Sequence, residues 1–234
     1  MIRDHVKIIC KVFFMIFESS PRFEQKNGME KIHRFFNIDT KTEQKLKESI
    51  EKSKGLIRIF VHPDFEAYTQ IDSVKKGEMG SIEGLKQAER VFKKILSSES
   101  EQAPPVFIFE AGWHEDDFLE KEEAIAKVSA RDVYVIRTEG ANPNPLPPDF
   151  ERGLRFMEYY KVSDAEREEM WKWIIEELKR WKVKKILIGG LEFYVSDKSD
   201  IGHGGCLGSA IEKLKDHFDI EISNMTWPER IRKL

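Results

Sequence analysis

Short hydrophobic runs alternate along this chain with longer segments in which hydrophobic positions recur at helical spacing. Several of the runs are nearly uninterrupted, which is typical of parallel strands that are covered on both faces. Regular alternation of such strands with helices predicts a three-layer α/β/α sandwich of Rossmann-like type. We expect a mostly parallel sheet of about five strands, at 56–61, 105–110, 132–137, 184–190 and 219–223.

The segments between these runs carry helix signals. We expect a first helix that starts with a capping box of Thr40 and Glu43 and stops before Gly55. A later helix should start with a second capping box, formed by Ser163 and Glu166. The helices are expected at about 40–54, 81–96, 117–128, 163–181 and 206–217.

Three tryptophans lie on the predicted helix 163–181. Trp171 and Trp181 belong to its hydrophobic stripe, whereas Trp173 lies beside the stripe. An exposed Trp173 would suit contact with a partner protein, although packing beneath a neighbouring loop is the favoured interpretation. The i,i+4 spacing of Glu176 and Arg180 predicts an ion pair on the same helix.

The first part of the chain differs from the rest. We interpret residues 1–38 as a peripheral N-terminal segment and residues 39–234 as a single α/β domain. The hydrophobic stretch 6–17 contains Lys7 and Lys11, so an extra strand or helix is favoured over a signal peptide. Sequence upstream of a true start at Met29 is a further alternative. No run approaches the roughly 18 apolar residues of a membrane span, so no membrane partner is expected.

Charge and cysteine content narrow the classes of partner and compartment. The formal net charge is −3 and no long basic block occurs, so we expect no nucleic acid partner. The two cysteines, Cys10 and Cys206, lie far apart in the sequence and form no disulfide framework. A soluble protein of the reducing cytoplasm is therefore expected.

Polar residues follow the predicted strands at their carboxyl ends, where α/β sheets bind their ligands. If the strands are parallel, these residues converge on one edge of the sheet. They are Asp64, Glu110, His114, Arg137, Glu139, Glu192, His203 and Cys206.

A glycine-rich turn follows the strand that ends at Gly190, with Glu192 in the connection. Backbone N–H groups at the start of the next helix would suit an anionic ligand. The pattern matches neither a P-loop nor a dinucleotide-binding fingerprint. A tight connection that only permits packing is the competing interpretation. The predicted ligand-binding residues are Gly190, Glu192, Gly204, Gly205, Gly208 and Ser209.

Cys206 falls within this turn, close to His203. A thiol at a helix N-terminus is a candidate nucleophile, because the helix dipole stabilises its thiolate and a nearby histidine can accept its proton. The alternative, which most single cysteines follow, is a small buried hydrophobic residue.

The order of these features resembles the layout of isochorismatase-like cysteine hydrolases. The resemblance rests on a strand followed by Asp64, the strand 106–110, a helix containing tryptophan, the strand 186–190, and Cys206 at the start of a helix. It implies an aspartate, a lysine and a cysteine nucleophile on this kind of fold, with Asp64 and Cys206 in two of these roles. Arg137 is nearest to the place of the lysine, and the connection from Gly190 to Cys206 is longer than the family layout implies.

A metal site is less well supported. Asp197, Asp200 and His203 lie three residues apart, and Glu110 and His114 would add further ligands for a divalent ion. No established metal-binding motif occurs, so we predict no metal site and leave the cofactor unidentified.

The sequence therefore predicts a domain that binds a small anionic molecule at the carboxyl edge of its sheet, as a hydrolase or transferase. Asp64 or Glu110 would be the general base. The first alternative is a cysteine hydrolase in which His203 or Asp64 activates Cys206. The second is a non-catalytic interaction module, a homo-oligomer for example, that uses Trp173 or the tail 227–234.

Overall fold

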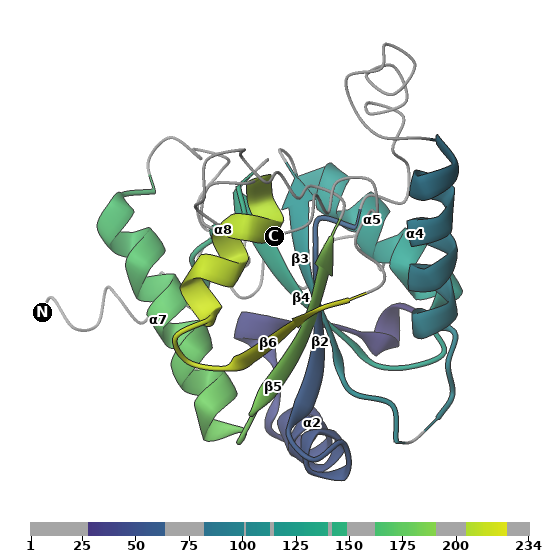
Figure 1. The fold of residues 1–234 in the computed structure, drawn as a ribbon, viewed down its shortest axis with the longest axis horizontal. Coiled ribbons are helices and arrows are strands. Elements are labelled where there is room, and N and C mark those ends of the chain that lie inside the picture. The colour runs from purple at the N-terminus through teal and green to yellow at the C-terminus, as the bar shows by residue number, and fades with distance from the viewer. Residues whose placement is uncertain are drawn as a thin grey trace, which may run out of the picture.

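A computed structural model describes residues 28–63, 82–100, 102–112, 115–139, 142–148, 162–190 and 205–223. Within these residues, six parallel strands form one sheet that lies between two layers of helices (Figure 1). This confirms the predicted Rossmann-like α/β architecture. None of the helices in the described ranges combines the length and the hydrophobicity of a membrane-spanning segment.

The observed elements agree closely with the predicted ones. The strands are β1 Ile32–Arg34, β2 Leu56–Val61, β3 Val106–Gly112, β4 Val133–Glu139, β5 Lys185–Gly190 and β6 Asp219–Ile222. The α-helices are α2 Thr40–Lys52, α4 Ile82–Leu96, α5 Glu115–Val128, α7 Asp164–Arg180 and α8 Gly205–Leu214.

The strand order determines where a ligand site is expected. The sheet runs β1-β4-β3-β2-β5-β6, so the chain proceeds from β2 to β4 on one side and then returns to β5 on the other. Ligands of such sheets bind outside the carboxyl ends of the strands, near the point where the order reverses. Here that point lies between β2 and β5, where Val61 is paired with Gly190.

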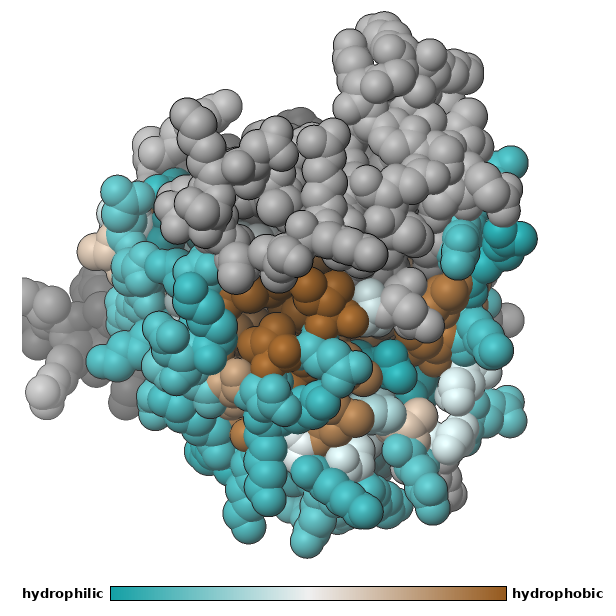
Figure 2. All heavy atoms as spheres, in the orientation of Figure 1, coloured by the Kyte–Doolittle hydropathy of each residue, from teal (hydrophilic) through white to brown (hydrophobic). Residues whose placement is uncertain are grey.

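Two hydrophobic cores hold the helices against the sheet. One face packs against α2, α7 and α8, and the other face packs against α4 and α5. Trp171 and Trp181 are buried in the first core, as predicted, and Trp171 stacks on Phe109. Figure 2 shows hydrophobic side chains at the centre of the face on which β6 forms the sheet edge, with hydrophilic side chains beside and below them.

Strand β1 was not predicted. It pairs with β4 at the edge of the sheet, and the buried residues Phe35 and Phe36 follow it directly. Its three residues include His33 and Arg34, so the strand lacks the hydrophobic run that identifies the others. The pairing with β4 extends the sheet into the segment 1–38.

Two local predictions were wrong. Asp39, not Thr40, caps α2, because its carboxylate accepts hydrogen bonds from the backbone N–H groups of Lys41 and Thr42 at 2.8 and 2.9 Å. Arg180 pairs with Glu177 and Glu43 instead of Glu176. The capping box of Ser163 and Glu166 is confirmed.

Candidate functional site

Four polar residues are linked to one another at the carboxyl edge of the sheet. His62 follows β2, Glu110 lies in β3, Thr138 lies in β4, and Lys121 comes from α5. We call these four residues the edge cluster. Thr138 hydrogen-bonds His62 and the backbone carbonyl of Glu110, and the Glu110 carboxylate pairs with Lys121. Three neighbouring strands and one helix therefore contribute to one connected group.

The hydrogen bonds of Thr138 determine the tautomer of His62. The Thr138 hydroxyl donates to the backbone carbonyl of Glu110 at 3.0 Å. The same oxygen lies 2.9 Å from Nε2 of His62. A carbonyl only accepts hydrogen bonds, so the single hydroxyl hydrogen is used there and Nε2 must be the donor. The other ring nitrogen, Nδ1, therefore carries the lone pair.

His62 is held in an unusual state. Its φ angle is 49°, in the left-handed region that a histidine seldom adopts. Only 9% of the residue is exposed. Burial, together with the nearby charge of Lys121, lowers the pKa of His62 to about 3. The imidazole is therefore neutral at pH 7 and able to accept a proton only when the site supplies a strong acid.

Lys121 brings a positive charge to Glu110. The Lys121 ammonium lies 3.6 Å from the Glu110 carboxylate and donates to the backbone carbonyl of Ala111 at 2.6 Å. The Glu110 side chain is 3% exposed, whereas that of Lys121 is 31% exposed. The ammonium thus forms the accessible side of a largely buried pair.

A second ion-pair network lies beside the Lys121–Glu110 pair, on the same face of the sheet. Arg137 is paired with Glu110 in the β-sheet register, and its guanidinium donates to Glu122 at 3.0 Å and Glu115 at 2.6 Å. Arg34 contacts both carboxylates from β1. Burial lowers the pKa of Arg137, but the neighbouring carboxylates outweigh it and raise the pKa above its ordinary value.

Arg137 was expected to face the ligand site at the end of its strand, but the ion-pair network holds its side chain in the interior. Its side chain is 1% exposed and packs over the ring of Phe118 at 4.7 Å. The Nη2 atom is buried and has no hydrogen-bond acceptor within the described part of the chain. Glu139 is also engaged, because Arg167 of α7 binds its carboxylate at 2.7 and 2.8 Å.

Cys206 lies in the first turn of α8, which follows β5 in the chain. The residue is 5% exposed and belongs to the core between the sheet and α2, α7 and α8. Lys121 approaches the sheet from α5 on the opposite face. The described structure therefore places the thiol and the Lys121–Glu110 pair on opposite faces of the sheet.

Other residues of the predicted glycine turn fall within α8. Gly208 is buried and Ser209 is exposed, while Gly205 begins the helix. Gly190 ends β5, where an added Cβ would lie 2.3 Å from the backbone oxygen of Val61. The missing side chain is thus needed for the close approach of β5 and β2, whatever its role toward a ligand.

Several predicted site residues lie outside the described residues: Asp64, His114, Glu192, Asp197, Asp200, His203 and Gly204. Their roles stay predictions. Within the ranges that the structure does describe, no three potential ligands come together as a metal site.

Three members of the edge cluster were missed as site residues. His62 carries a usable signal, because it is the first residue after a hydrophobic run. Thr138 and Lys121 carry none, because their contacts depend on strand register and on the rotation of α5. Comparison of the chain with protein-family models, curated proteins and solved structures finds no match. The functional argument therefore rests on the geometry of this site.

Proposed function

We propose that this protein binds a small anionic molecule at the carboxyl edge of its sheet and acts on it as a hydrolase or transferase. The observation that carries the proposal is the edge cluster, which combines an accessible ammonium, a buried carboxylate and a neutral imidazole. Titratable groups in perturbed environments are concentrated at catalytic sites. The carboxyl edge of a parallel sheet is also where such folds bind ligands.

The anion would be held by Lys121. Its ammonium is the accessible cation of the cluster and already lies beside a backbone carbonyl and a carboxylate. The buried Nη2 of Arg137 is a further donor on this side of the sheet. A buried donor without an acceptor costs about 1–3 kcal/mol, which a ligand oxygen or a water molecule would recover.

Glu110 would take the proton and His62 would orient the substrate. Glu110 is the general base in this proposal, because its carboxylate lies beside the ammonium that binds the substrate. His62 accepts a hydrogen bond from the substrate at Nδ1, since Nε2 donates to Thr138. Asp64, two residues after His62, is the alternative base that the sequence predicts.

Replacing Lys121 with Gln should weaken anion binding at least tenfold. A hydrogen bond to a charged group contributes about 1.5–3 kcal/mol, which corresponds to roughly ten- to hundredfold in affinity. A panel of phosphates, nucleotides and carboxylates is screened by thermal stabilisation, and each hit is titrated by calorimetry. The matched control is Lys127→Gln, which removes an exposed charge from the same helix. Equal weakening in both variants, or no hit in the panel, would contradict the proposal.

A cysteine hydrolase is the second candidate, favoured by the position of Cys206 at the start of α8. In that case Cys206 should be alkylated rapidly well below pH 8.5, the pKa of a free thiol being about 8.5. The measurement is the pH dependence of alkylation in the full chain carrying Cys10→Ser, which leaves a single thiol. Because Cys206 is buried, the first proposal expects slow modification that becomes fast in denaturant.

The interaction-module alternative has less support. Trp173 is 39% exposed and packs on Phe36, with ring centroids 4.8 Å apart. Part of the Trp173 ring is therefore already covered by Phe36 of the same chain. The tail 227–234 lies outside the described residues.

A further inference from the structure

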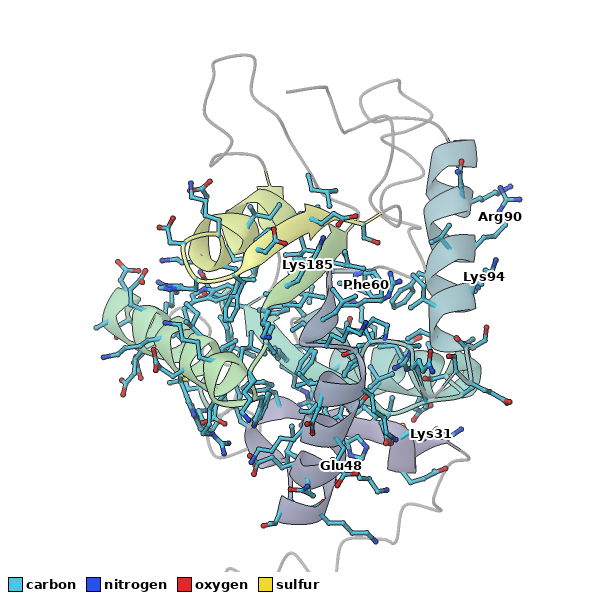
Figure 3. All side chains as sticks on the ribbon, turned by 60° about the horizontal axis from the view of Figure 1, so that its bottom comes forward. Lys31, Glu48, Phe60, Arg90, Lys94 and Lys185 are labelled. Carbon is cyan, nitrogen blue, oxygen red and sulfur yellow. The ribbon has the colours of Figure 1, made fainter. Side chains whose placement is uncertain are left out.

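A second cavity lies at the amino edge of the sheet, opposite the edge cluster. There the turn from α2 to β2 meets the turn from α7 to β5, and the backbone N–H of Lys184 donates to the carbonyl of Gly55 at 2.8 Å. Gly55 has a φ of 84°, and an added Cβ would lie 2.9 Å from the carbonyl oxygen of Lys182. The two turns are thus in direct contact, and Figure 3 brings this edge of the sheet forward.

The cavity between these turns has a volume of about 330 Å³. We call it the basic pocket. Ile50 and Trp181, both buried in the core, contribute its hydrophobic surface. The other residues that line it are Lys47, Glu51, Lys54, Gly55, Arg180, Lys182 and Lys184.

The basic pocket carries an excess of positive charge. Five of its lining side chains are cationic and one, Glu51, is anionic. Glu43 lies beside it and binds Lys47 at 2.8 Å and Arg180 at 2.6 Å. These hydrogen bonds, that of Lys47 first, lower the pKa of Glu43 to about 2, so it is ionised.

The negative charges near the basic pocket balance only part of its positive charge. The carboxyl ends of α2 and α7 each present roughly half a negative charge. Together with Glu43 and Glu51 they offset about three of the five cations. Lys54, Lys182 and Lys184 make no ion pair with any residue in the described ranges.

Two of these lysines occupy costly backbone positions. Lys54 has a φ of 60° and Lys182 a φ of 62°, in the left-handed region where glycine and asparagine are favoured. Either of those residues would end the helices at lower cost. Strained backbone of this kind is often retained where the side chain has a function.

We propose that the basic pocket binds a second small anionic molecule, an organic phosphate or a carboxylate with a hydrophobic body. The hydrophobic part would contact Ile50 and Trp181, and the anionic group would be held by Lys54, Lys182 and Lys184. The volume is at the lower end of the range of small-molecule sites, about 300–1,000 Å³, and is too small for a folded partner. This site is independent of the edge cluster.

The probe for this site is phenyl phosphate, which combines the two features in one small molecule. Calorimetric titration of the full chain should show binding, and the double variant Lys54→Asn, Lys182→Asn should weaken it at least tenfold. Since asparagine suits the left-handed region better than lysine, the same variant should keep or raise the melting temperature. Weaker binding without loss of stability separates a ligand role of the lysines from a structural one.

Two controls distinguish this site from general electrostatics and from the edge cluster. Lys52→Gln with Lys179→Gln removes two charges from the last turns of α2 and α7 outside the pocket lining, and should leave the affinity within about twofold. Lys121→Gln weakens only the binding at the edge cluster, so titration of this variant should still show phenyl phosphate binding to the basic pocket with unchanged affinity. The proposal is overturned if phenyl phosphate does not bind, if the asparagine variant binds like the parent, or if either control weakens binding equally.

Discussion

Replacing Arg137 with Met should lower the free energy of unfolding by about 3–5 kcal/mol, because it leaves a buried carboxylate without its main partner. The side chains of Arg137 and Glu122 are each 1% exposed and lie 3.0 Å apart. In the variant, Glu122 would keep only the contact with Arg34, at 3.2 Å. Methionine fills a similar volume, so the loss reports the unpaired charge more than a cavity.

Urea denaturation at pH 7 measures this effect. Arg180→Met is the matched control, because Arg180 also pairs with two carboxylates but is 49% exposed. Exposed pairs contribute about 0–1 kcal/mol, so the control should change stability little. Adding Glu122→Met to Arg137→Met should recover part of the loss, since the unpaired charge is then removed. A loss below about 1 kcal/mol in the single variant would show that the network tolerates an unpaired Glu122.

Acid should destabilise the protein through His62. Its pKa is about 3 in the folded chain, against an ordinary value of 6.5. Between these values the unfolded chain binds the proton and the folded chain does not, so stability falls as pH falls. The slope is roughly 1.4 kcal/mol per pH unit at most, which amounts to several kcal/mol across the whole interval. Above pH 6.5 the imidazole is neutral in both the folded and the unfolded chain, so His62 no longer lowers the stability.

The comparison that isolates this effect is the parent chain against His62→Gln. The glutamine amide can still donate to Thr138 but does not titrate, so the stability of the variant should depend less on pH between 6.5 and 3. Glu43, whose pKa is lowered from 4.5 to about 2 in the folded chain, also makes stability fall below about pH 4.5, but equally in both proteins. His217→Gln removes an exposed histidine and should follow the parent. Parallel stability curves for all three proteins would rule out the buried, neutral state of His62.

The hydrophobic pattern predicts most of the sheet. Strand β2 was predicted with the observed bounds, 56–61, because a run of β-forming residues follows a glycine that ends a helix. The capping box at Ser163 was predicted for the same local reason. Strand β1 was missed because its stabilisation comes from pairing with β4, a distant contact that leaves no signal in three residues.

Less of the site could be predicted. Glu110 was predicted from its place at a strand end, and the structure places it buried within β3, two residues before the strand ends. Arg137 was expected to face the same site, but its side chain is bound by Glu122 and Glu115 of α5. Lys121 was missed because its contact with the strand end depends on how α5 packs on the sheet. Which helical residues face a strand end depends on how the helix packs, and hydrophobic spacing gives that rotation only approximately.

The position of β1 has a consequence for how the chain assembles. His33 hydrogen-bonds Asp132, which lies 99 positions later in the sequence. A ribosome that adds about 5–20 residues per second needs roughly 5–20 s to make that stretch. During this interval β1 has no strand to pair with, and later β4 presents an open edge until β1 docks. Because such edges template aggregation, the docking of the short strand β1 is the step that covers β4.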